Sequence, residues 1–264
     1  MDPFHLKLLL AFGLGSVMIT ATTVLTETAG SKVGGLTGGI PSMVSITLLF
    51  IGIVEDPRAA SEATTFIPQV MGINGLFLVV YAFLTRWGGW VALAGAFASW
   101  ALLSSVVFFA RIENFLFSVL MCVFCLVFSY SMLDRKLRVR SGGRLPHRYT
   151  PAEIAFRALF SGSIVVSAVY FSKIGGPVWG GILAPFPTVY LSSLTIMQRS
   201  NGVEHALALT KPLLVSSLVN VLAYSIAVRY FYLHFSLAAG TILALAVSGC
   251  SAYAAYRFIK ERMT

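Results

Sequence analysis

Apolar segments long enough to cross a membrane follow one another along almost the whole chain. A spanning helix needs about 20 mainly apolar residues, and nine segments of the 264-residue sequence approach this length: 6–26, 33–53, 64–84, 88–109, 113–132, 153–173, 178–197, 208–231 and 236–258. Charged residues make up only 11% of the chain, against about 25% in soluble domains. The sequence therefore predicts an all-α polytopic membrane protein with about nine transmembrane helices.

Basic residues gather outside these segments and predict the orientation of the chain. The net charge is +9, and much of the excess lies in the loop 134–148 and near the C-terminus, at 257–262. Basic loops stay on the cytoplasmic side of a membrane, so we expect a plasma or inner membrane protein with its C-terminus in the cytoplasm and its N-terminus outside. No RNA- or DNA-binding motif accompanies the charge. We therefore expect membrane lipids, and no nucleic acid, among the partners.

Two halves of the chain repeat one glycine-rich phrase. "SKVGG" at 31–35 matches "SKIGG" at 172–176, and matching prolines and mid-span asparagines follow in the same order: Pro41 with Pro185 and Pro187, Pro68 with Pro212, and Asn74 with Asn220. This series predicts a four-helix repeat in 1–110, a linking transmembrane helix and basic cytoplasmic loop in 111–150, and a second four-helix repeat in 151–264. A single linking helix would invert the second repeat in the membrane, which is the arrangement of many secondary transporters.

The second repeat also carries stretches that resemble a family of small membrane proteins. "GGILAPFPTVYLSSLTIM" and "LVSSLVNVLAYSIAVRYFY" resemble helices of the four-span GlpM-like proteins, and the first repeat, with "ETAGSKVGGLTGGIPSMVSITLLFIGI", looks similar in kind. The resemblance implies a duplicated and fused GlpM-like chain. It also implies a distant similarity to the drug/metabolite transporter superfamily, in which four-span proteins pair as antiparallel dimers. The antiparallel exporters of that group couple protons through a glutamate in the middle of the first span, which this chain lacks.

Four charged residues near the predicted helices are candidates for binding a solute or an ion. Glu27 lies near the end of the first span, where it is either a functional buried carboxylate or a loop residue paired with Lys32. Lys32 and Lys173 each precede a Gly-Gly pair at the start of a helix, where free N–H groups favour anions. Lys211 lies roughly 10 Å into its span, at about 1.5 Å per residue. It either reaches outward to the interface or binds an anionic group in a cavity.

Glycines and prolines mark the places where helices could break. The glycines suit either close helix packing or an anion site. Each proline either breaks its helix by removing a backbone donor, which in matched positions of two halves points to a transport site, or lies harmlessly in the first turn. Asn74 and Asn220 either bridge helices or line a polar path. The helix-break candidates are Gly34, Gly35, Pro41, Pro68, Gly175, Gly176, Pro185, Pro187 and Pro212.

The sequence contains no pattern typical of an enzyme. It has no nucleophile–base pair and no phosphate loop, and its four histidines are scattered without metal-ligand spacing. We therefore expect no enzymatic activity, no cofactor and no metal. The pattern favours a secondary transporter that moves a small solute by alternating access between spans 1–3 and 6–8, and the lysines favour an anionic or phosphorylated solute. The alternative is a membrane scaffold or accessory factor for envelope lipid or polysaccharide assembly. The pattern predicts neither the identity of the solute nor the oligomeric state.

Overall fold

The helices of the first half run from α1 to α6. The structure is a computed structural model that describes residues 3–28, 41–140 and 149–262, except for the side chains of 26–28 and 262. Every regular element in these ranges is helical. The first half contains α1 (Pro3–Thr28), α3 (Ser42–Val54), α4 (Pro57–Ala63), α5 (Ile67–Leu84), a 3₁₀ turn (Thr85–Trp87) and α6 (Gly89–Ala110).

A linking helix and seven further elements complete the described chain. The linking helix α7 (Phe115–Ser131) ends in a π-helical turn (Met132–Lys136). The second half contains α8 (Pro151–Gly175), α9 (Pro177–Leu183), α10 (Thr188–Asn201), α11 (Val203–Ala208), α12 (Thr210–His234) and α13 (Leu237–Arg262). Both halves thus place a short helix, α4 or α11, directly before a long one, α5 or α12.

These helices agree with most of the predicted spans. Within the described residues, eight helical segments are long and apolar enough to cross a membrane, and α3 is a shorter apolar helix. The chain is therefore a multi-pass helical membrane protein, whereas the count of nine spans stays a prediction. The second predicted span, 33–53, is described only from residue 41 onward, where it forms α3. The seventh, 178–197, is divided between α9 and α10.

Local signals at the helix starts explain several of the boundaries. The side chains of Asp56 and Asn114 each accept a hydrogen bond from the backbone N–H three residues on, at 2.8 and 2.9 Å, and so cap α4 and α7. Thr150 and Glu153 form a capping box at the start of α8. Pro68 and Pro212 lie in the first turns of α5 and α12, where a missing N–H costs little. Both prolines thus lie where their helices begin.

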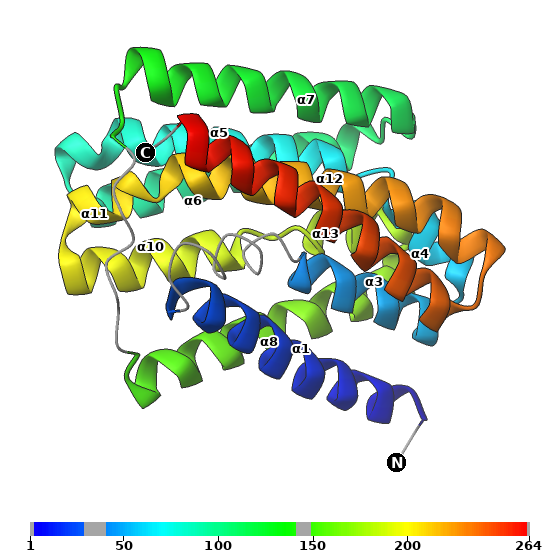
Figure 1. The fold of residues 1–264 in the computed structure, drawn as a ribbon. Helices are drawn as coiled ribbons and strands as arrows, with labels where there is room; N and C mark the ends of the chain where they lie inside the picture. The colour runs from blue at the N-terminus through cyan, green and yellow to red at the C-terminus, as the bar shows by residue number, and fades with distance from the viewer. Residues whose placement is uncertain (1–2, 29–40, 141–148, 263–264) are drawn as a thin grey trace.

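The long helices lie side by side along one direction, and α1 with α8 and α5 with α12 pack as antiparallel pairs (Figure 1). Along α1 and α8, the rings of Phe4 and Tyr170 are 6.2 Å apart, and a Cβ at Gly15 would lie 3.1 Å from Val165. The helices α5 and α12 also pack against each other, and each contacts the helix that follows it, α6 or α13.

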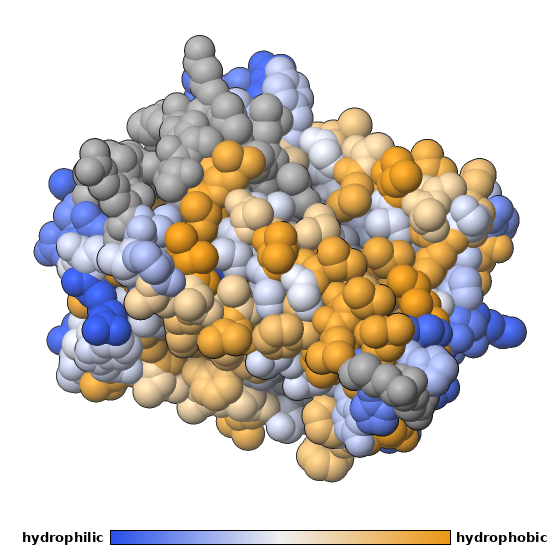
Figure 2. Space-filling model, turned by 90° about the horizontal axis from the view of Figure 1, so that it is seen from below, coloured by the Kyte–Doolittle hydropathy of each residue, from blue (hydrophilic) through white to orange (hydrophobic). Residues whose placement is uncertain are grey.

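The interior of the bundle is formed by α5 and by the segment that contains α9 and α10. In each of these two, 72% of the most apolar stretch is buried, against 22–33% in α1, α6, α7, α8 and α13. The outer helices expose large apolar side chains such as Val17, Phe109, Phe124, Leu159 and Ile242. Figure 2 shows a broad apolar region across the middle of one face, with polar residues toward both ends. This is the surface that a membrane-embedded bundle requires.

The two ends of the bundle differ in charge. At one end, the C-terminal ends of α7 and α13 meet, and the rings of Tyr130 and Phe258 are 5.9 Å apart. We call this the basic end, because the arginines and lysines of 135–140 and 257–260 lie there. The opposite end, here the α4 end, holds the start of α1, the end of α3, all of α4 and the end of α12 (Figure 1). There Lys7 Nζ donates to the carbonyl oxygen of Ile53 at 2.7 Å. The helix α1 therefore begins at the α4 end, and α13 finishes at the basic end (Figure 1).

Two glycines bring α9 into close contact with the first half. A Cβ at Gly181 would lie 2.5 Å from the carbonyl oxygen of Ala63 and 2.7 Å from Cβ of Phe66, and one at Gly180 would lie 2.7 Å from Ile51. Small residues allow helix backbones in membranes to approach this closely. The glycines of α9 therefore act in packing.

We expect Gly181→Ala to destabilise the protein by about 1–3 kcal/mol, because the added methyl group would press on backbone that cannot rotate away. Unfolding in mild detergent, followed by helix content, measures the change. Gly249→Ala is the matched control, since no heavy atom lies within 4 Å of its added Cβ. That variant should lose no stability, and an equal loss in the two variants would contradict the packing argument.

Candidate functional site

The seventh predicted span breaks in the interior of the protein. The helix α9 ends at Leu183, α10 begins at Thr188, and the buried Pro185 and Pro187 lie between them. Proline has no N–H, so two prolines spaced by one residue interrupt the helical ladder. Helical hydrogen bonding resumes at Pro187, whose carbonyl oxygen accepts a hydrogen bond from the N–H of Leu191 at 2.8 Å. The break thus exposes backbone groups that need partners from elsewhere.

Asn74 supplies one of those partners from the middle of α5. Its Nδ2 donates to the carbonyl oxygen of Pro185 at 2.7 Å, and its side chain is 3% exposed. A backbone carbonyl without a partner in the interior costs about 1–3 kcal/mol. The amide of Asn74 therefore holds the break in its present shape and connects the two halves of the chain at this point.

An aromatic cluster surrounds the residue at the centre of the break. The ring of Phe186 lies 4.8 Å from Trp100 and 6.0 Å from Phe97, both on α6, and 6.1 Å from Phe160 on α8. Aromatic pairs at these centroid separations attract each other beyond simple burial. The cluster closes the space beside the break in the structure described here.

Three buried polar atoms near the break have no hydrogen-bond partner in the described part of the chain. They are Asn74 Oδ1, Thr188 Oγ1 and Trp100 Nε1. Most buried polar groups in proteins are paired, and unpaired polar atoms also occur elsewhere in the described interior, such as Thr47 Oγ1 and Tyr224 Oη. Together the three atoms near the break offer an acceptor, a hydroxyl and a donor, and all three are uncharged.

One turn further along, α10 connects to α12. The hydroxyl groups of Tyr190 and Ser217 are hydrogen-bonded to each other, and the ring of Tyr190 lies 6.0 Å from Phe77 on α5. This contact fixes the start of α10 between the two central helices, so the break is flanked by α5, α6, α8 and α12.

Of the predicted lysines, Lys211 is neutralised and Lys173 is exposed. Lys211 Nζ lies 2.9 Å from Asp134 Oδ1, and its side chain is 8% exposed against 43% for that of the aspartate. Lys211 therefore pairs with the end of the linking helix, which neither sequence interpretation included. Lys173 lies in the last turn of α8 and is exposed. The side chain of Glu27, together with Lys32, Gly34 and Gly35, lies outside the described residues.

The remaining candidates fall at turns or helix pairs rather than at the break. Gly175 and Gly176 form the turn between α8 and α9, and Gly176 has a φ of 85° that disfavours other residues. Pro41 begins α3 with φ −76° and ψ 57°, close to the −74° and 40° of Pro187 at the start of α10. Asn220 accepts a hydrogen bond from Ser251 Oγ at 2.9 Å and so connects α12 to α13.

Two arginines within the helices of the second half were not among the predicted site residues. Arg157 on α8 is 1% exposed and donates to Ser193 Oγ at 3.4 Å. Arg229 on α12 donates from Nη1 to Thr65 Oγ1 at 2.9 Å. Each was the single arginine inside an apolar segment, and that isolation was the signal available, because charged residues in spanning helices are usually functional or paired.

Comparisons with known proteins return no relative. No family model, no curated protein and no solved structure matches this chain, so the resemblance to GlpM-like proteins stays a prediction. Among the described residues, no group of three or more His, Cys, Asp or Glu side chains could hold a metal ion.

Proposed function

We propose that the chain is a secondary transporter whose solute passes the break between α9 and α10. The break itself carries the proposal. Irregular backbone within a membrane is tolerated only where protein or water satisfies it, and interrupted helices near the membrane midplane form the binding sites of many secondary transporters. Thr188 begins the 14-residue α10, which places it about 20 Å from the basic end at 1.5 Å per residue.

The unpaired polar atoms beside the break support a binding role. Leaving Asn74 Oδ1, Thr188 Oγ1 and Trp100 Nε1 unpaired costs about 1–3 kcal/mol each, which a polar solute or water at the site would recover. The three unpaired atoms belong to neutral side chains, and Lys211 is already paired. They favour an uncharged polar solute over the anionic solute that the lysines suggested.

The opposed directions of corresponding helices support an inverted repeat. The pairs α1 with α8 and α5 with α12 are antiparallel, and α3 and α10 start from prolines of similar conformation but run toward opposite ends of the bundle (Figure 1). Two such halves could rock about a central site and open it to each side in turn. In this proposal the N-terminus lies outside the cell and the C-terminus in the cytoplasm.

A cysteine at position 188 tests the proposal without knowledge of the solute. We expect Thr188→Cys, in a protein whose Cys122, Cys125 and Cys250 are replaced by serine, to react with a membrane-impermeant thiol reagent from either side of sealed vesicles. The side chain of Thr188 is fully buried in the present structure, so labelling requires other states in which the break opens. Alternating access predicts such states on both sides.

Ser225→Cys is the matched control for this measurement. Ser225 is equally buried, and its hydroxyl donates within its own helix, to the carbonyl oxygen of Val221 at 2.8 Å. It should remain unlabelled from either side. Labelling of Thr188→Cys from one side only, or from neither, would reject alternating access at the break and favour the scaffold alternative.

A further inference from the structure

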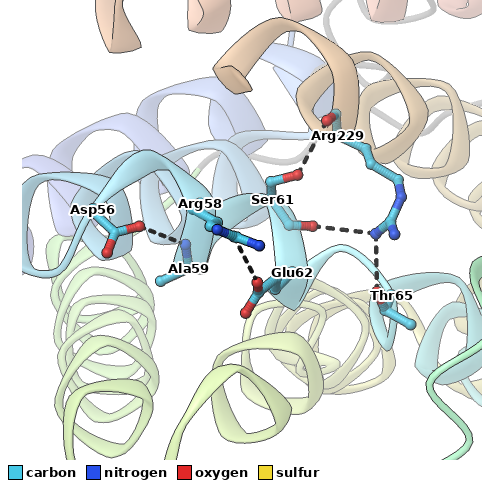
Figure 3. A network of polar contacts seen from close by, with 7 residues as sticks. All are labelled: Asp56, Arg58, Ala59, Ser61, Glu62, Thr65 and Arg229. Atoms are coloured by element: carbon cyan, nitrogen blue, oxygen red, sulfur yellow. Dashed lines mark hydrogen bonds and ion pairs between the residues drawn. The ribbon is translucent and has the colours of Figure 1, made fainter. Parts of the chain in front are cut away.

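A pocket opens at the α4 end of the protein, between α4 and α12 and away from the helix break. Its volume is about 430 Å³, and it is lined by Arg58, Ser61, Glu62, Arg229 and Leu233. Figure 3 shows the polar network on this side, with Arg229 reaching from α12 toward the turn that follows α4. Neither the transport proposal nor the sequence candidates involve these residues.

Arg229 is held in place through one of its three guanidinium nitrogens. Nη1 donates to Thr65 Oγ1 at 2.9 Å and approaches the carbonyl oxygen of Ser61 at 3.4 Å, while the guanidinium lies 4.5 Å from the ring centroid of Phe115. Ser61 Oγ donates in return to the Arg229 carbonyl oxygen at 3.0 Å. Nε and Nη2 donate to none of the described residues. A positioned guanidinium with spare donors is suited to bind an oxyanion.

The other charges in the pocket leave a positive excess. Arg58 Nε lies 3.3 Å from Glu62 Oε1, and both side chains are largely exposed, at 81% and 55%. An exposed pair one helical turn apart is weak, so Arg58 can turn toward an added anion. Two guanidinium groups and one carboxylate give the pocket a net charge of +1.

The pocket lies at the boundary between the apolar surface and the polar end. On α12, the side chains of Ile226, Tyr230 and Leu233 are 46%, 57% and 54% exposed, so this helix presents an apolar surface beside Arg229. In a membrane such a surface contacts lipid chains, and the polar groups next to it lie near the lipid head groups. A phosphate could therefore reach Arg229 from a lipid or from the aqueous side.

From these contacts we propose that the pocket binds a phosphate group, carried either by a phospholipid head group or by a small soluble phosphate ester. Arginine forms two parallel hydrogen bonds to phosphate oxygens, and the free Nε and Nη2 of Arg229 offer such a fork. Arg58 supplies the second charge, and Glu62 opposes binding.

Two pairs of probes test the proposal on the full-length protein in neutral detergent. One pair is dioleoylphosphatidylglycerol against dioleoylglycerol, which has the same chains and no phosphate; the other is glycerol 1-phosphate against glycerol. The shift of the unfolding midpoint with probe concentration gives an apparent Kd. We expect only the phosphate member of at least one pair to stabilise the protein. Stabilisation by the phospholipid identifies a head-group site, and stabilisation by glycerol 1-phosphate identifies a site for a soluble ester.

Variants then test whether the pocket is responsible. Arg229→Gln should weaken phosphate binding about tenfold or more, since it removes a charge-assisted hydrogen bond. Glu62→Gln removes the opposing charge and should strengthen binding severalfold, so a gain accompanies the loss even where Arg229→Gln folds less stably. Arg257→Gln is the control, because Arg257 forms the equivalent exposed pair with Glu261, at 3.2 Å, on α13.

The control should bind like the unaltered protein. Equal stabilisation by probes with and without phosphate would overturn the proposal. Unchanged affinity in both Arg229→Gln and Glu62→Gln would overturn it as well. Neither result bears on the labelling of Thr188→Cys, so the two proposals succeed or fail separately.

Discussion

Replacing Asp134 by asparagine is expected to lower the free energy of unfolding by about 2 kcal/mol. The substitution would leave the Lys211 ammonium, 8% exposed, without its counter-charge. Removing one member of a fully buried pair costs about 3–5 kcal/mol, and we take a smaller value because Asp134 is 43% exposed, so that water can reach the lysine through the same opening. Denaturant unfolding in detergent measures the difference.

The converse substitution should be milder. Lys211→Met leaves a carboxylate that is nearly half exposed and can be hydrated, so we expect it to cost under about 1 kcal/mol. The double variant should be more stable than Asp134→Asn alone, because it leaves no buried charge. As a control, Glu261→Gln breaks the exposed pair with Arg257 and should have little effect. If Lys211→Met were the more damaging change, Lys211 would not be the poorly solvated partner.

The ion pair with Asp134 gives Lys211 a structural role, and the sequence could not predict this partner. The two residues are 77 positions apart, and Asp134 lies in the π-helical turn after α7. The pair therefore connects the linking helix to the start of α12. Asp134 lies in a segment whose other charged residues are basic, so neither hydropathy nor local spacing indicated that it would contact Lys211.

The helices themselves were predictable because one physical requirement fixes their length. The predicted spans 88–109 and 113–132 correspond to α6 at Gly89–Ala110 and α7 at Phe115–Ser131. In both cases the apolar run begins directly after a turn residue or a polar cap, Gly88 before α6 and Asn114 before α7. Where length and local caps decide the structure, sequence is sufficient.

The break in the seventh span could not be predicted from the residues around it alone. Its apolar run looks continuous, and prolines at 185 and 187 are compatible with either a kink or a helix start. The shape of the break depends on a hydrogen bond from Asn74, 111 residues away, and on the aromatic contacts of Phe186 with α6 and α8. The position of Arg229 likewise depends on distant residues, because the oxygen atoms that accept its hydrogen bonds belong to α4 and the turn that follows it.

Substituting leucine for Asn74 should open the break. The hydrogen bond from Asn74 Nδ2 to the Pro185 carbonyl oxygen stabilises the conformation in which Thr188 is buried, and leucine is of similar size but donates nothing. Losing the bond and leaving the carbonyl unpaired costs the closed state about 1–3 kcal/mol. Because 1.4 kcal/mol corresponds to a tenfold change in an equilibrium constant, we expect Thr188→Cys to be labelled about tenfold faster in this background.

Asn220→Leu provides the comparison that separates opening of the break from general weakening. Asn220, on α12, is the asparagine that the sequence pattern matched with Asn74, and it is equally buried, at 1% against 3% exposed. Its side chain bonds to Ser251 on α13. Interhelical hydrogen bonds in membranes contribute about 1 kcal/mol, so both variants should lose some stability. Only Asn74→Leu should accelerate labelling at position 188. Equal acceleration in both variants, or none in either, would show that Asn74 does not hold the break closed, and the solute path would then have to be sought away from Pro185.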